Sequence, residues 1–157
     1  PDEWELRFDL DPNDPSDAMG DLDGDGITNL QEFLNGTPAS GSIDIDGNNQ
    51  YDALTDGLLI LRDMFGLTED ALVSGAVAND AQYKTANEIQ ERILLLGDLV
   101  DVDGNGEKDA LTDGLILVRY LFGLRGNALI EGVVGGNATR TSFESIEAHL
   151  ESLTPIL

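Results

Sequence analysis

Apolar residues recur at helical spacing in two stretches of the chain. In residues 54–65 and again in residues 111–122 they return every three or four positions, which places them on one face of an α-helix. A glycine directly follows each stretch, at Gly66 and Gly123, and favours a helix C-terminus there. No stretch has a convincing strand pattern. The hydrophobic pattern therefore predicts a mostly α-helical protein.

Two more helices are predicted after each of these stretches. In the first copy, Thr68 can start a short helix that runs to Val73. A longer helix follows, and a capping box predicts its start, with Thr85 and Glu88 in one copy and Thr141 and Glu144 in the other. The apolar stripes of these last helices are Ile89, Ile93, Leu96, Ile146, Leu150 and Leu153.

The repeated order of elements reflects an internal duplication. Residues 42–98 and 99–157 align without a gap over about fifty positions, of which roughly twenty are identical. The run Asp-Ala-Leu-Thr-Asp-Gly-Leu is shared whole, at 52–58 and 109–115. A unit of this length is small for an independent core, so we expect two duplicated three-helix units that pack as one domain. Residues 1–41 form a separate N-terminal segment.

Acidic residues dominate the charge of the chain. It has 31 acidic and 8 basic residues, for a net charge of −23. Such a field repels nucleic acid and anionic membranes and attracts divalent cations. No run of apolar residues is long enough to predict membrane insertion. The absence of cysteine excludes disulfides, zinc–thiolate sites and cysteine catalysis.

Three clusters of acidic residues have the spacing of calcium loops. Residues 21–32 match the EF-hand loop, with acids at positions 1, 3, 5 and 12 and a glycine at position 6. Alternate residues in such a turning loop direct their oxygens to one centre, and position 7 contributes its carbonyl. Asn29 can hold the water-bridged position. The predicted ligands are Asp21, Asp23, Asp25, the carbonyl of Ile27, and Glu32.

The duplicated loops, residues 44–56 and 101–113, vary this scheme. Their closing acid is an aspartate at position 13 instead of a glutamate at position 12, and we predict a local bulge that accommodates the extra residue. Asn49 replaces the glycine at position 6, since asparagine also tolerates positive φ. The predicted ligands are Asp44, Asp46, Asn48, the carbonyl of Gln50, Asp52 and Asp56 in one loop, and Asp101, Asp103, Asn105, the carbonyl of Glu107, Asp109 and Asp113 in the other.

Calcium fits these loops better than the alternatives. Ca²⁺ takes six to eight oxygen ligands in irregular geometry, whereas Mg²⁺ needs a tighter octahedron with retained waters. Acidic, solvated turns without an ion are the remaining interpretation. About three Ca²⁺ ions are expected. At a calcium concentration about 100 times the dissociation constant, each ion would add about 2.7 kcal/mol to stability.

The N-terminal segment resembles the calcium loops of bacterial secreted proteins related to thrombospondin type 3 repeats. The resemblance lies in residues 21–32 and the Phe33-Leu34-Asn35-Gly36-Thr37 that follows. Residues 1–5 resemble the back half of such a loop, with Asp2 at position 9 and Glu5 at position 12. We therefore expect that the natural protein extends upstream or that another chain completes this site.

The duplicated region resembles dockerins, which carry two calcium loops, each followed by a helix. This resemblance implies an extracellular module that docks onto a cohesin-like receptor. The loops lie 57 residues apart, a longer spacing than is usual in dockerins. Ala53-Leu54 and Ala110-Leu111 are apolar where many dockerins carry a polar, cohesin-reading pair.

These observations predict a non-catalytic, extracellular or cell-surface structural or interaction module of bacterial type. No nucleophile–base set indicates an enzyme. Extracellular calcium fills sites that cytosolic calcium leaves empty. A calcium-rigidified subunit of a self-assembling polymer, and a true dockerin, are the alternatives. We expect His149 to have a surface or packing role, and Arg62 and Arg119 to pair with nearby acids.

Overall fold

The described part of the chain folds into helices and contains no strand. The computed structural model describes all residues except 1, 9, 23–26, 36–38, 40 and 156–157. The helical content of the described residues confirms the predicted, mostly α-helical class. The α-helices are α1 (Asp2–Arg7), α2 (Asn29–Asn35), α3 (Leu58–Met64), α4 (Glu69–Val73), α5 (Ala86–Leu95), α6 (Leu115–Leu121), α7 (Asn127–Ile130) and α8 (Phe143–Ser152). Shorter turns of 3-10 helix are η1 (Asp17–Met19) and η3 (Gly97–Val100), and π-helical turns are η2 (Ala53–Gly57) and η4 (Ala110–Gly114).

The helices predicted over residues 54–65 and 111–122 each consist of two parts. Each begins as a π-turn, η2 or η4, and continues as α3 or α6. The glycine stop is confirmed, because Gly66 and Gly123 have φ of +75° and +88°. In both, the residue after the glycine donates its N–H to a carbonyl five residues back, which closes the helix end.

The two halves of residues 42–157 pack against each other through these helices. Gly57 lies against Val118 and Leu121 of α6, and Gly114 lies against Leu61 and Met64 of α3. Because low residue numbers in one helix meet high numbers in the other, α3 and α6 run antiparallel. The absence of a side chain at both glycines allows the two backbones to approach closely.

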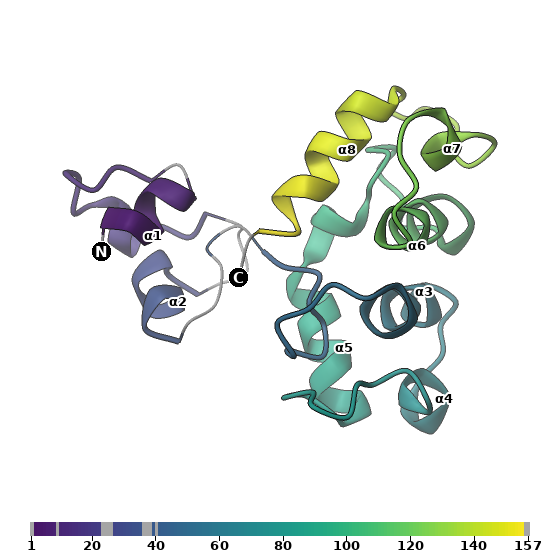
Figure 1. Ribbon diagram of the computed structural model, residues 1–157, viewed down its shortest axis with the longest axis horizontal. Helices are drawn as coiled ribbons and strands as arrows, with labels where there is room; N and C mark the ends of the chain where they lie inside the picture. Colours follow the sequence, from purple (N-terminus) through teal and green to yellow (C-terminus); the bar gives the residue numbers. More distant parts are fainter. Residues whose placement is uncertain (1, 9, 23–26, 36–38, 40, 156–157) are drawn as a thin grey trace.

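One apolar core joins the two halves. Fully buried side chains from α3, α5, α6 and α8 surround it, with α5 and α8 on one side of the α3–α6 pair (Figure 1). Across the described chain, the largest fully buried side chains are Ile43, Ile45, Leu59, Ile60, Leu72, Ile89, Ile116, Leu117, Leu129, Ile146, Leu150 and Leu153. None of the helices in the described ranges has the length and apolar character needed to cross a membrane.

The predicted capping boxes have different outcomes. Thr85 and Glu88 form the expected box at the start of α5. The box predicted from Thr141 and Glu144 is wrong, because α8 is capped by Ser142, whose side chain accepts from Ser145 N at 3.3 Å. Ser142 is the residue that corresponds to Thr85 at the 57-residue offset, and serine caps a helix as well as threonine does.

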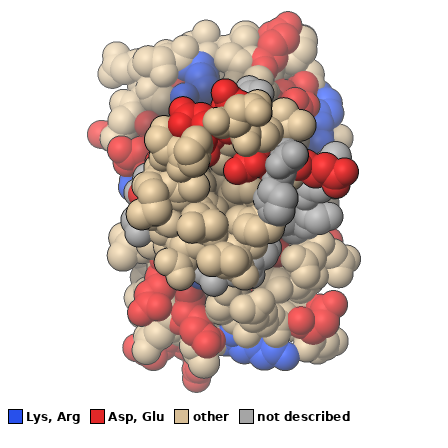
Figure 2. Space-filling view, turned by 90° about the vertical axis from the view of Figure 1, so that its left-hand side faces the viewer, with Lys and Arg blue, Asp and Glu red and all other residues tan. Residues whose placement is uncertain are grey.

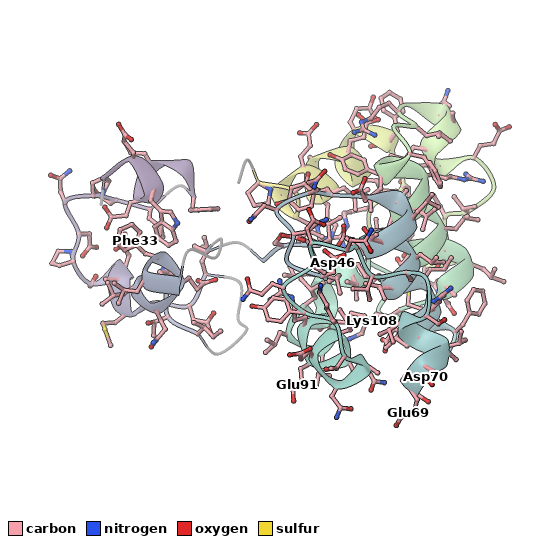
Figure 3. The ribbon with its side chains drawn as sticks, turned by 60° about the horizontal axis from the view of Figure 1, so that its bottom comes forward. Phe33, Asp46, Glu69, Asp70, Glu91 and Lys108 are labelled. Carbon is pink, nitrogen blue, oxygen red and sulfur yellow. The ribbon has the colours of Figure 1, made fainter. Side chains whose placement is uncertain are left out.

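The N-terminal segment has its own small aromatic cluster. The Trp4 ring makes edge contacts with Phe8 and Phe33, with ring centres 4.9 and 5.5 Å apart. This segment lies to one side of the helical body, in purple and dark blue in Figure 1, and Phe33 lies inside it in Figure 3. At the junction with the body, Ile43 N donates to Leu153 O at 3.0 Å.

Candidate metal centres

Two groups of three aspartates lie close enough to hold a metal ion. Each residue of a group offers a carboxylate oxygen, and these oxygens lie within 4.8 Å of one another. The first group is Asp44, Asp46 and Asp56, and the second is Asp101, Asp103 and Asp113. All six side chains are at most 8% exposed. Asp46 lies inside the helical body in Figure 3.

The carboxylate of the first aspartate of each loop accepts three hydrogen bonds from backbone N–H groups of the same loop. Asp44 Oδ1 accepts from Gly47 N and Asn48 N, at 2.9 and 3.1 Å, and its Oδ2 accepts from Asn49 N at 2.9 Å. Asp101 makes the same three contacts in the second loop. The turn requires positive φ at position 6, which Asn49 adopts at +62°. The prediction that asparagine replaces the glycine there is confirmed.

The closing aspartate reaches the group through a π-turn. Gly57 N donates to Asp52 O at 3.1 Å, a span of five residues that holds one more residue than an α-turn. This turn is the local bulge expected at position 13. Asp56 Oδ1 accepts from Ile45 N at 2.7 Å, and Oδ2 accepts from Asp52 N at 2.9 Å. The π-turn thus compensates for the shift of the acid from position 12.

Burial makes the negative charge of these groups costly. Desolvation raises the pKa of Asp56 to about 7, against two backbone hydrogen bonds that lower it. Desolvation also raises the pKa values of Asp44 and Asp103. Three carboxylates this close repel one another, and a bound cation would relieve both costs.

One buried oxygen in the first group has no hydrogen-bond partner among the residues that the structure describes. Asp46 is fully buried, and its Oδ2 accepts from Ala78 N at 2.8 Å. Its Oδ1 is buried without a hydrogen-bond partner in the described part of the protein. Buried polar atoms are nearly always satisfied, so an orphaned carboxylate oxygen beside two other carboxylates fits a metal ligand. The donors are all oxygens, which suits a hard cation.

The remaining predicted ligands of these loops lie at the edge of each group. Asn48 and Asn105 turn their side-chain oxygen to the backbone N–H two residues ahead, at 2.9 and 2.7 Å. Asp52 and Asp109 are exposed and do not belong to the close groups. The side chains of Gln50 and Glu107 are also exposed, as expected for residues that would contribute only their carbonyls.

The N-terminal loop is described only in part. Its predicted ligands Asp23 and Asp25 lie outside the described residues. Asp21 is exposed, Ile27 is half-buried, and Glu32 is 2% exposed. Asn29, expected at a water-bridged position, instead braces the loop, because its amide group accepts from Leu22 N at 3.0 Å and donates to Asp17 O at 2.8 Å.

Backbone amides and two arginines that support the loops were not predicted. Ala78 N binds Asp46, and Gly135 N binds Asp103 Oδ2 at 2.6 Å. Arg92 donates to the carbonyls of the first two residues of its loop, both at 2.8 Å, and Arg140 makes the matching contacts in the other loop. The amides carry no sequence signal, and the arginines occupy different positions of the two units.

Two expectations concern other charged residues. Arg62 and Arg119, expected to pair with acids, instead donate to backbone carbonyls at the ends of α4 and α7. His149, expected to have a surface or packing role, is half-buried, and its Nε2 lies 2.7 Å from Leu99 O. Burial lowers the pKa of His149.

Comparison with family models, curated proteins and solved structures found no match for this chain. The case for the function therefore depends on the geometry of the two aspartate groups.

Proposed function

We propose that this protein is a non-catalytic structural module that binds calcium at residues 44–56 and 101–113. The observation that carries the proposal is Asp46, which is fully buried beside Asp44 and Asp56 and whose Oδ1 has no protein partner in the described chain. A third calcium site at residues 21–32 is proposed from the sequence alone.

The loops favour calcium over magnesium. Each combines three carboxylates with side-chain amide and backbone carbonyl oxygens, a donor set large enough for the six to eight ligands of Ca²⁺. Mg²⁺ binds through one or two carboxylates and keeps several waters, which suits an open site better than these buried ones. Weak sites of this kind fill at extracellular calcium concentrations, so we place the module outside the cell or on its surface.

The ion would act by removing repulsion inside the fold. Figure 2 shows many acidic and few basic side chains on one face of the protein, in line with the net charge of −23. Within each loop, three carboxylates with at most 8% exposure face one another. Two occupied sites would add about 5 kcal/mol at a calcium concentration about 100 times the dissociation constant. That is a large share of a typical domain stability.

Calcium titration by calorimetry, with thermal melting in calcium and in chelator, tests the proposal. We expect at least two bound ions and a melting temperature that falls by about 10 °C or more on chelation. Asp46→Asn and Asp103→Asn should each remove one ion. Asp70→Asn is the matched control, since Asp70 is exposed on α4, outside both loops. Absence of calcium binding in the unmodified chain would refute the proposal.

A docking role is the second candidate. Four large apolar side chains are more than half exposed at matching places in the two units: Leu54, Leu111, Phe65 and Phe122. The antiparallel packing of α3 and α6 brings the last residue of each π-turn near the end of the opposite helix. We propose a cohesin-like domain as the partner, on the dockerin resemblance. Calorimetry with purified cohesin domains in calcium tests it, and Leu54→Ser with Leu111→Ser should abolish any binding.

A further inference from the structure

The third residue of each loop is bound by a segment from outside the loop. Asp46 Oδ2 accepts from Ala78 N at 2.8 Å, and Asp103 Oδ2 accepts from Gly135 N at 2.6 Å. Both contacts span 32 residues. Ala78 lies between α4 and α5, and Gly135 lies between α7 and α8. In each case one carboxylate oxygen is taken by a backbone amide.

The same segments bind the main chain of the same aspartates. We call residues 76–83 and 133–140 the cover segments. Asp46 O accepts from the N–H groups of the last two residues of its cover segment, both at 2.9 Å. Asp103 O accepts from the two equivalent groups, at 3.1 and 2.8 Å. Ala76 and Val133, at the first position of each segment, are buried in the core. Each cover segment is thus fixed between the core and one aspartate.

The second cover segment lies so close to its loop that a side chain at Gly135 would displace two of the predicted ligands. A Cβ at Gly135 would overlap Asn105 Nδ2 and would lie 2.8 Å from Asp103 Oδ2. Gly136, the next residue, has open space where its Cβ would be. Neither glycine has a positive φ, so the effect of a side chain at Gly135 would not come from backbone strain. It would come from the proximity of the predicted ligands.

We propose that the cover segments are part of the metal sites, with Ala78 and Gly135 as positioning residues. This inference rests on the proposed calcium binding. The terminal torsion of an aspartate is soft, so a carboxylate without a fixed partner rotates freely. An amide on Oδ2 fixes the group, and in Asp46 it leaves Oδ1 for the ion. Groups that orient metal ligands in this way typically change affinity 10–100-fold when they are altered.

Calcium titration of the full chain with Gly135→Ala, against Gly136→Ala, tests the inference. Both variants add one methyl group and remove the same backbone freedom, but only the first displaces Asp103 and Asn105. We expect Gly135→Ala to lose about tenfold in affinity at one site and to leave the other unchanged. Gly136→Ala should stay within about twofold of the unmodified chain at both sites.

The outcomes separate this inference from the proposed function. If the unmodified chain binds no calcium, the proposed function fails and the inference fails with it. If the unmodified chain binds calcium and Gly135→Ala binds it as Gly136→Ala does, only the role of the cover segments is overturned. Asp103→Asn identifies which of the measured sites is the second loop.

Hydrogen exchange on the unmodified chain tests the same inference without a substitution. The ion and the cover segment bind the same carboxylate, so removal of calcium should release the amides of both cover segments. We expect residues 76–83 and 133–140 to lose more protection on chelation than α3 and α6 do. Equal loss in the cover segments and in these core helices would overturn the inference.

Discussion

The two acidic loops place a guanidinium at the same two carbonyls, but the arginine comes from a different position in each unit. Arg92 lies on α5 and stacks over Tyr83, with its Cζ 4.2 Å from the ring centre. At the 57-residue offset, Tyr83 corresponds to Arg140, and Arg92 corresponds to His149. The cation and the ring have thus exchanged places. The loop therefore requires a forked donor at this point in space and not at one position of the repeat.

The loops also differ in how far the protein satisfies the hydrogen-bonding capacity of the aspartate at position 3. Asp103 Oδ1 accepts from Asn105 N at 3.1 Å. Asp46 Oδ1 is buried with no such partner in the described residues. The first loop therefore holds more uncompensated negative charge when no ion is bound. We expect it to gain more from calcium than the second loop does.

The largest predicted effect reverses sign with calcium. In calcium, Asp46→Asn should lower the free energy of unfolding by about 3 kcal/mol, because one site is lost. In chelator the same variant should raise it, because the new amide donates to Asp44 and Asp56 where a carboxylate repelled them. Asp103→Asn should show the same reversal with a smaller gain in chelator. Urea unfolding under both conditions measures these differences.

The control for this reversal is Asp70→Asn. It removes one negative charge from an exposed residue outside the loops and the cover segments, and it should change stability by less than about 0.5 kcal/mol under either condition. If Asp46→Asn raised the free energy of unfolding in calcium, repulsion among the carboxylates would outweigh the binding of the ion. If Asp103→Asn gained more stability in chelator than Asp46→Asn, the second loop and not the first would hold more uncompensated charge.

The second prediction concerns pH in calcium-depleted buffer. Burial raises the pKa of Asp56 to about 7, above its unfolded value near 4. Between these values the folded protein binds more protons than the unfolded chain, so stability falls as pH rises. We expect the free energy of unfolding to increase by about 2 kcal/mol from pH 7 to pH 5. With calcium the trend should reverse, because protons compete with the ion.

Urea midpoints at pH 5 and pH 7 measure this dependence, and Asp56→Asn is the variant that isolates it. Without the carboxyl group, most of the gain between pH 7 and pH 5 should disappear. If the increase in stability from pH 7 to pH 5 were unchanged in Asp56→Asn, other acidic residues would be its cause.

The third prediction tests the exchanged arginines. Arg92→Ala leaves the carbonyls of Asp44 and Ile45 without their donors, and should cost about 2 kcal/mol in calcium. The double variant Tyr83→Arg with Arg92→His rebuilds the arrangement of the second unit in the first. We expect it to recover about half of the loss, as measured by urea unfolding. Arg92→His alone should recover none, and equal stability of the single and double variants would argue against an exchange.

The sequence predicted the parts of the site that repeat with the chain and missed those that depend on packing. The loop spacing led to all six grouped aspartates, and the extra residue before Asp56 led to the expected bulge. Ala78 and Gly135 act through backbone amides, which every residue except proline has, so these contacts left no signal in the sequence. The roles of Arg92 and Arg140 were not predicted, because an alignment of the two units compares residues at equal positions. The contacts with the loop depend instead on where each side chain reaches in space.

The smallest predicted effect compares the two glycines between α3 and α6. Gly57 and Gly114 have the same helical conformation, with φ of −59° and ψ of −42° and −40°. The gain in stability from the higher helix propensity of alanine should therefore be equal at both positions. A Cβ at Gly57 would lie 3.1 Å from Leu121 Cδ1, whereas one at Gly114 would lie 2.8 Å from Leu61 Cδ1 and 3.0 Å from Met64 Sδ. Gly57→Ala should therefore be neutral within about 0.5 kcal/mol, and Gly114→Ala should destabilise by about 1 kcal/mol through overpacking. Urea midpoints in calcium measure the difference. Equal shifts would mean that the helix pair adjusts its spacing equally at both ends, and that the units differ only at their loops.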